Sequence, residues 1–328
     1  MRFSVLAGFC LLSMSGFSQT IEVLNSGIKS SLRGLSVLND NVIWTSGSGG
    51  TVGRSIDGGK TWEWNKVPGF EKREFRDIEA FDENTAIVIA IAEPGNILKT
   101  TDGGRSWKTV FTDTTKGVFM DAMDFADAKN GIVIGDPIND EVYLLTTKDG
   151  GETWDKYRGS PIKTSKGEAF FAASGTNIIL HAKNRFTAIS GGMISRLITQ
   201  DNAVELPMAK GKETTGAYSL AIYKDQAVVV GGNYTADTSS QGNCVMFKLS
   251  QPPAFRKPAV PPHGYRSGVE FITGGQLICC GTSGVDVSND LGMHWTLISK
   301  DSYNVVQRSK AGRTVILAGD GKIAKLVY

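Results

Sequence analysis

A short motif recurs along this chain at a nearly constant spacing. Near-identical copies are centred on Asp57, Asp102 and Asp149, and each reads Ser/Thr-x-Asp-Gly-Gly-x-Ser/Thr-Trp. Worn copies begin at Ser288 and Thr199. The three good copies are separated by 45 and 47 residues, a length that holds four short strands and their turns. Internal repeats of this length predict a ring of small sheets, the β-propeller.

Each position of the motif has a structural role in a tight turn. The aspartate side chain accepts hydrogen bonds from backbone N–H groups a few residues further on. The glycines allow positive φ angles, and the tryptophan covers the hairpin with a large apolar ring. We therefore expect these aspartates to fix turns rather than to take part in catalysis or metal binding.

The third strand of each repeat can be counted along the chain, and the count predicts a single seven-bladed β-propeller. The last unit stops after its third strand, and the segment Thr20–Leu24 precedes the first unit. We expect this N-terminal segment to complete the last blade and close the ring, which removes an exposed sheet edge. Six or eight blades stay open as alternatives, because the fourth and fifth units have lost the motif. The third strands begin near Thr51, Asn96, Val142, Met193, Val245, Val285 and Lys322.

The composition is typical of an all-β globular chain. Of the 328 residues, 41% are hydrophobic, which is enough for a large core, and 39 glycines punctuate short runs rich in Val, Ile and Thr. The net charge is +2, which argues against a nucleic-acid-binding tail or a polybasic membrane patch. The sequence after the N-terminus has no apolar run long enough for a membrane helix. Because no dinucleotide or metal-ligand spacing appears, we expect no cofactor and no metal.

The N-terminus has the pattern of a secretory signal peptide. Arg2 supplies a positive charge, Val5–Met14 is a short apolar stretch, and small residues precede a cleavage point after Ser18. The alternative is a buried N-terminal strand. We expect residues 1–18 to be the signal peptide and residues 19–328 to form the propeller of a secreted or periplasmic protein.

Three cysteines follow the expected cleavage point. Cys279 and Cys280 are adjacent in a predicted strand, so their side chains should point to opposite faces of the sheet. We expect Cys244, Cys279 and Cys280 to be buried free thiols. A disulfide between Cys244 and one of the other two is the alternative.

The candidate site lies at one rim of the predicted ring. The first strand of each blade lines the central channel, and the loops between second and third strands share that rim, so functional side chains should gather there. Arginine binds carboxylates in a bidentate way and aromatic rings stack on sugars, which predicts an anionic or sugar ligand. The alternative is a polar channel mouth whose charges pair internally. The candidate ligand-binding residues are Arg33, Arg76, Tyr234, Tyr265 and Arg266, and the candidate catalytic residues are Glu168, Asp77, Asp121 and Asp136.

The repeat unit resembles the BNR/Asp-box superfamily, to which the sialidases belong. The segments Phe75–Ile78, Gly135–Pro137, Gly167–Gly175 and Gly264–Ser267 are similar to those of bacterial proteins related to the plant photosystem II stability/assembly factor. This resemblance covers essentially the whole chain after residue 18 and implies a secreted or periplasmic seven-bladed propeller. The plant relatives are assembly factors that bind protein. Sialidases carry Phe-Arg-Ile-Pro near the start, whereas Arg33 is followed here by Gly and Leu, so sialidase activity is not implied.

Two functions follow from these observations. The first is a binding or assembly module, expected as a monomer, that holds a protein or a glycan at the rim and has no nucleic-acid partner. The alternative is a carbohydrate-active enzyme, a glycoside hydrolase or lyase acting on an acidic sugar. Glu168 would be its acid/base, because apolar surroundings raise the pKa of a carboxyl group. Asp77, Asp121 or Asp136 would supply the second carboxylate.

Overall fold

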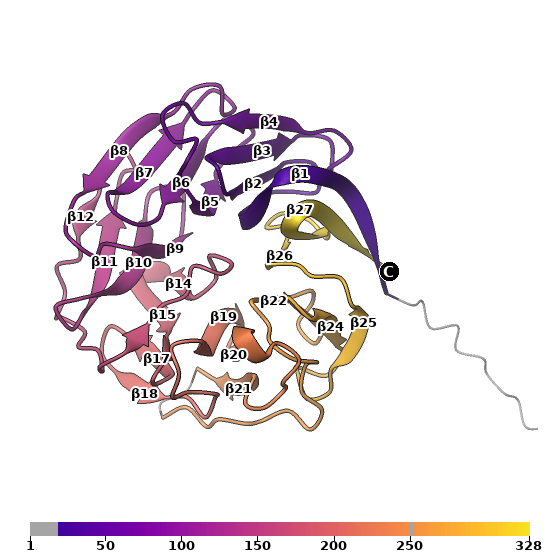
Figure 1. Cartoon of the computed structure of the whole chain (residues 1–328). Coiled ribbons are helices and arrows are strands. Elements are labelled where there is room, and N and C mark those ends of the chain that lie inside the picture. Colours follow the sequence, from indigo (N-terminus) through magenta and orange to yellow (C-terminus); the bar gives the residue numbers. More distant parts are fainter. Residues whose placement is uncertain (1–18, 250–251) are drawn as a thin grey trace, which may run out of the picture.

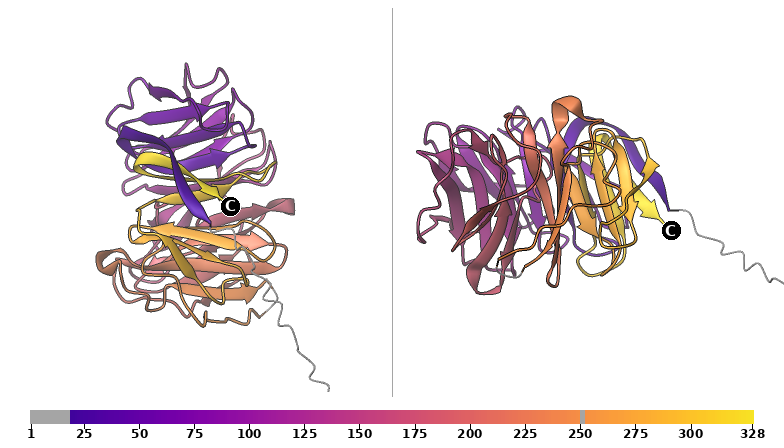
Figure 2. Two further views of the ribbon diagram at one scale, coloured as in Figure 1. Left: turned by 90° about the vertical axis from the view of Figure 1, so that its right-hand side faces the viewer. Right: turned by 90° about the horizontal axis from the view of Figure 1, so that it is seen from below.

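The computed structural model describes residues 19–249 and 252–328, and the predicted signal peptide lies outside the described residues. Antiparallel sheets are arranged around a central axis (Figure 1), and from the side they form a thick disc (Figure 2). The two short 3-10 turns are η1 (Ala182–Asn184) and η2 (Tyr234–Ala236). The fold is therefore an all-β propeller.

The described residues form six hydrogen-bonded sheets, each built from neighbouring antiparallel strands. The largest has the order β26 (Val305–Arg308), β27 (Val315–Val327), β1 (Thr20–Val37), β2 (Ile43–Gly47), β3 (Thr51–Ser55) and β4 (Glu63–Lys66). The second and third sheets contain β5 (Phe75–Ala80), β6 (Ala86–Ala90), β7 (Gly95–Thr100) and β8 (Lys108–Asp113), then β9 (Met120–Phe125), β10 (Gly131–Ile138), β11 (Glu141–Thr147) and β12 (Asp155–Lys156).

The remaining sheets follow in chain order around the ring. The fourth contains β14 (Ile178–His181), β15 (Arg185–Ile189), β17 (Arg196–Thr199) and β18 (Ala203–Glu205). The fifth contains β13 (Glu168–Ala169), β16 (Gly191–Gly192), β19 (Thr215–Tyr223), β20 (Gln226–Asn233) and β21 (Cys244–Lys248). The sixth contains β22 (Gly268–Phe271), β23 (Leu277–Gly281), β24 (Gly284–Ser288) and β25 (Thr296–Ser299).

The prediction of seven blades is wrong, because the structure shows six. The strands expected to form the first and the last blade belong to one six-stranded sheet. Strand β1 joins the two groups of strands. Its first part pairs with β27 from Thr20 to Ser26, and its last part pairs with β2 from Leu32 to Val37. The pairing of Thr20–Val23 with the C-terminal strand is present. What the sequence did not reveal is that one 18-residue strand runs through both pairings.

The core lies between adjacent sheets rather than inside any one of them. Trp44 on β2 packs in one buried cluster with Phe75 and Val88 of the next sheet. Cys244 and Cys279 share another cluster, and all three described cysteines are free and buried. Burial raises the pKa of the Cys244 and Cys280 thiols to about 12. Each sheet is thus apolar on both faces and is stabilised by its neighbours.

The repeated motif forms the tight turns that its chemistry predicts. In the first copy, Asp57 Oδ1 accepts from Thr61 N at 2.9 Å, and Asp57 Oδ2 accepts from Thr61 Oγ1 at 2.6 Å. Trp62 Nε1 donates to Gly59 O at 3.0 Å. Gly58 N donates to Asn41 O, which places the motif turn beside the β1–β2 turn. The motif turns therefore lie at the opposite end of the sheets from Arg33, away from the candidate rim.

Candidate functional site: a pocket at one end of the channel

A pocket of about 440 Å³ lies where the first strands of several sheets converge. We call it the channel pocket. Six of the nine predicted site residues line it, and Phe171, Tyr218, Ser267 and Asn304 line it as well. The predicted residues in the pocket are Arg33 on β1, Arg76 on β5, Asp121 on β9, Asp136 on β10, Tyr234 in η2 and Tyr265 before β22.

The floor of this pocket is a chain segment that crosses the channel. We call residues 170–177 the crossing segment. On one side Arg33 Nη1 donates to Ala173 O at 3.3 Å and Arg76 Nη1 donates to Ala172 O at 3.0 Å. On the other side Ser174 Oγ donates to Ser267 O at 2.6 Å. The segment leads into β14 of the fourth sheet, whereas these partners lie in or next to the first, second and sixth sheets. The segment therefore reaches across the channel and gives the pocket a bottom.

Two arginines stand next to each other on the pocket wall. Arg76 Nε pairs with Glu74 Oε2 at 3.2 Å, and the Arg76 side chain is 24% exposed. Burial lowers the pKa of Arg76, and the charge of Arg33 lowers it further. Each guanidinium group uses one Nη atom on the crossing segment and has other N–H groups left. Two neighbouring cations in a concave site favour an anionic ligand group.

An acid pair lies beside these arginines. Asp121 is fully buried, and neither of its carboxyl oxygens has a hydrogen-bond partner among the described residues. Burial raises the pKa of Asp121 well above its usual value, and the nearby Asp136 raises it further, while Arg76 opposes the shift. Asp136 Oδ1 accepts from Phe170 N at 2.9 Å, and burial raises its pKa too. Burial of Asp121 therefore favours the protonated, neutral form of its carboxyl group over the carboxylate.

Aromatic rings form another part of the pocket lining. Phe171 and Tyr218 are stacked with ring centroids 3.9 Å apart, and Tyr265 meets Tyr218 edge-on at 4.8 Å. Tyr234 stands over them and is 49% exposed. Burial raises the pKa of Tyr218 and of Tyr265, so both phenols stay protonated. Phe171 and Tyr218 were not among the predicted site residues. The sequence signal for Tyr218 is an aromatic ring near the start of a channel strand, whereas Phe171 lies in the crossing segment and has no such signal.

The structure places Glu168 outside the channel pocket, in a buried ion pair. Arg196 Nε donates to Glu168 Oε1 at 2.8 Å and Arg196 Nη2 to Oε2 at 2.7 Å. Ser190 Oγ donates to Oε1 at 2.5 Å and Ser165 N to Oε2 at 2.9 Å. The Glu168 carboxylate is therefore surrounded by four hydrogen-bond donors and not by the apolar side chains that the sequence predicted. Glu168 holds β13 to its neighbours and is not among the pocket lining.

Asp77 and Arg266 are also corrected to structural roles outside the pocket lining. Asp77 Oδ1 accepts from Ile78 N and Oδ2 from Met123 N, both at 2.8 Å, which links β5 to β9. Arg266 is fully buried and its Nε donates to Asp286 Oδ2 at 2.8 Å. His263 Nδ1 lies 2.5 Å from the other oxygen of Asp286. The third predicted arginine is therefore already neutralised inside the protein.

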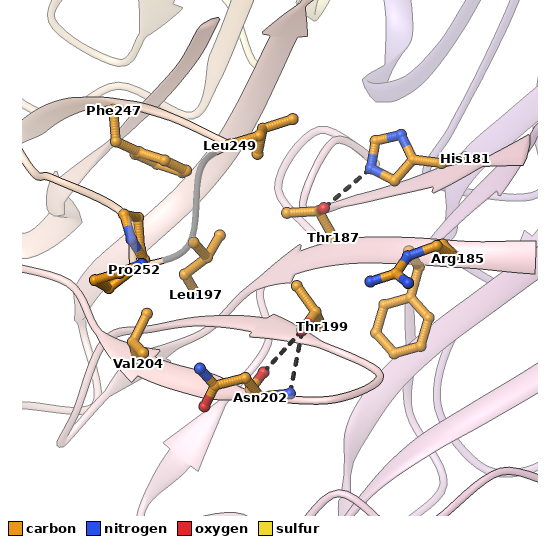
Figure 3. A pocket seen from close by; sticks show the side chains of 12 residues that line it. His181, Arg185, Thr187, Leu197, Thr199, Asn202, Val204, Phe247, Leu249 and Pro252 are labelled. Carbon is orange, nitrogen blue, oxygen red and sulfur yellow. Dashed lines mark hydrogen bonds between the residues drawn. The ribbon is translucent and has the colours of Figure 1, made fainter. Parts of the chain in front are cut away.

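A second cavity, of about 230 Å³, lies between the fourth sheet and β21 (Figure 3). Its walls include Phe186, Leu197 and Phe247. His181 lies 3.0 Å from Thr187 Oγ1, and burial with the nearby Arg185 lowers the pKa of its ring. A neutral histidine on a mostly apolar wall offers no reactive group here. The channel pocket carries the richer chemistry.

In the described parts of the chain, no cluster of three or more His, Cys, Asp or Glu side chains could hold a metal ion. Within those same residues, no helix has the length and hydropathy needed to cross a membrane. The class of protein that emerges is a β-propeller with a polar and aromatic pocket at one end of its channel.

Solved structures of known proteins share this fold, although their sequences are distant. One is titled "YCF48 bound to D1 peptide", with a TM-score of 0.64 and 16% identity over 94% of this chain and 97% of that one. YCF48 from Cyanidioschyzon merolae gives 0.66 and 17% over 93% and 98%. A streptogramin B lyase gives 0.66 and 13% over 94% and 97%. No protein-family model and no curated protein sequence matches this chain.

Proposed function

We propose that this chain is a non-catalytic binding module that holds a segment of another protein in the channel pocket. The single observation that carries the proposal is the arrangement of the pocket itself. Neighbouring Arg33 and Arg76 face an unpartnered, fully buried Asp121 over a closed floor. Such a site holds charged ligand groups but shows no nucleophile with an adjacent base.

A protein segment fits this pocket better than a small metabolite. The two arginines supply donors for a carboxylate of the segment, either a side chain or a chain end. Tyr234 and Tyr265 offer aromatic surface for an adjacent apolar side chain. The structural similarity to YCF48, whose solved complex contains a D1 peptide, supports a peptide ligand. The sequence pattern of residues 1–18 supports a secreted or periplasmic location.

The alternative function, a carbohydrate-active enzyme, required Glu168 as its acid/base, and Glu168 does not line the channel pocket. Glu168 is held by Arg196 with a side chain that is 0% exposed, so it cannot reach a ligand in the channel pocket. The acid pair Asp121 and Asp136 would have to carry the chemistry alone. The binding module needs no such step, and we take it as the better supported function.

The test is capture of a defined partner by the wild-type protein and by pocket variants. Envelope extract is passed over immobilised protein, retained proteins are identified, and peptides covering the captured partner are titrated by calorimetry. We expect one peptide to bind wild type and to lose affinity in Arg33→Ala and Arg76→Ala. Arg185→Ala, which removes a surface ion pair with Asp201, is the matched control. Turnover of a glycan by wild type, or equal peptide affinity in all variants, would refute the proposal.

A further inference from the structure

A further concave site lies at the outer edge of the largest sheet, away from the channel pocket. It is a groove of about 520 Å³ between β4 and the first part of β1. We call it the edge groove. Trp62 and Trp64 line one side, with nearly parallel rings whose centroids are 5.4 Å apart. Asn25 and Lys29 belong to the opposite side.

Trp64 is not required by the repeat motif. The motif tryptophan of this copy is Trp62, whose Nε1 donates to Gly59 O. Two residues after the motif tryptophan, the other copies carry Thr109, Lys156 and Leu297. The Trp64 ring lies against Gly53 so closely that a Cβ there would come within 2.3 Å of it. The Trp64 indole N–H makes no hydrogen bond to a described residue and stays available to a ligand.

The rim of the edge groove is polar and basic. Asn25 and Asn65 bring side-chain amides, each with donors and an acceptor. Lys29 and Lys66 are exposed, and neither forms an ion pair within residues 19–249 and 252–328. The register between β1 and β27 is broken from Ser26 to Ser31, with Gly27 at a φ of 81°. Residues Ser26 to Lys29 of this irregular stretch line the far side of the groove.

We propose that the edge groove is a carbohydrate-binding site, and that it takes a chain of pyranose sugars bearing carboxylate groups. The flat apolar face of a pyranose ring packs on an indole ring, and the sugar hydroxyls pair with the Asn25 and Asn65 amides. Lys29 and Lys66 supply charge for uronate carboxylates. A proline-rich peptide also packs on tryptophans, but its prolines carry no carboxylate to pair with Lys29 and Lys66. The site is independent of the channel pocket.

The probes are two soluble oligosaccharides of equal length, cellohexaose as the neutral chain and hexagalacturonate as the acidic chain. Binding to the folded chain is measured by calorimetry and by tryptophan fluorescence. We expect the acidic chain to bind more tightly than the neutral one at low salt. Lys29→Ala with Lys66→Ala should remove that difference. Trp64→Ala should weaken both ligands by about tenfold.

Matched variants separate the site from its surroundings. Thr109→Ala, at the equivalent position of the second copy, should bind like wild type, and so should Arg76→Ala in the channel pocket. If Trp64→Ala does not fold, Asn65→Ala takes its place and should still weaken both sugars. Absence of binding by either sugar, equal affinity in folded Trp64→Ala or Asn65→Ala, or preference for a proline-rich peptide would overturn the proposal. Failure of the peptide capture described above would leave this test unaffected.

Discussion

The guanidinium group of Arg76 donates a 3.0 Å hydrogen bond to the backbone carbonyl of Ala172, so a residue of β5 helps to hold the segment that closes the channel. Arg33 makes the matching bond to Ala173. The residues offered to a ligand are therefore also those that fix the pocket floor. Binding and order of the crossing segment should be coupled.

The first prediction concerns this coupling. The double variant Arg33→Ala, Arg76→Ala should lose two hydrogen bonds worth about 1 kcal/mol each. Backbone amides of residues 171–177 should then exchange with solvent faster, while amides of the β22–β25 sheet should not change. Hydrogen exchange followed by mass spectrometry measures both regions. Unchanged exchange in the crossing segment would show that Ser174 and its partners hold it without the arginines.

The second prediction assigns Glu168 to stability. Glu168→Gln leaves Arg196, whose side chain is only 14% exposed, without its carboxylate. Breaking a buried ion pair in this way costs about 3 kcal/mol, which urea unfolding should detect. Peptide binding in the channel pocket should be unaffected once the variant is folded. A variant of normal stability that has lost an enzymatic activity would restore the catalytic interpretation.

The third prediction uses the worn copy of the motif. Leu291 stands where the other copies have a glycine, and its φ is 61°. A left-handed conformation is unfavourable for a residue with a side chain, so Leu291→Gly should stabilise the protein by about 1 kcal/mol. Leu291→Ala is the control and should bring no such gain. Thermal unfolding of both variants decides the matter.

The fourth prediction concerns acid. Turn hydrogen bonds, led by that of the Thr61 side chain, lower the pKa of Asp57 from 3.8 to about 2. The unfolded chain therefore takes up protons first as the pH falls, so this contribution is present above pH 3.8 and is lost on the way down to about 2. Asp57→Asn should make stability less dependent on pH in that window. If the slope of unfolding free energy against pH is the same in Asp57→Asn and in wild type, the turn does not stabilise the charged form of Asp57.

Much of the fold could be predicted from local sequence, because the motif determines its own turn. Asp57, Asp102 and Asp149 each accept from the hydroxyl residue four positions on, which the spacing alone implies. The number of blades could not be predicted in the same way. The number of blades depends on whether the strand that pairs with β27 continues into the strand that pairs with β2. No residue of β1 indicates that these two strands are continuous.

The grouping of candidate residues around the channel pocket could be predicted in part, for a related reason. A propeller places the starts of its first strands at one rim, so Arg33, Arg76 and Asp121 could be grouped without a structure. Glu168 shares that position, but Arg196, 28 residues later, neutralises it. Arg266 is likewise paired with Asp286, 20 residues away. Partners on other strands decide which charges are free, and strand pairing in space is what sequence reasoning could not supply.

The last prediction concerns Glu270, a partly buried channel residue on β22. Burial raises the pKa of Glu270 from 4.5 to about 7, while the backbone N–H groups of Arg308 and Phe271 oppose the shift. As the pH rises above 4.5 the unfolded chain loses its proton first, so folding stability falls until the folded carboxyl titrates near pH 7. Glu270→Gln removes this titration. We expect its melting temperature, relative to wild type, to be higher at pH 8 than at pH 5. A difference that is the same at both pH values would show that Glu270 titrates normally in the folded protein, and that the channel is more polar than its lining implies.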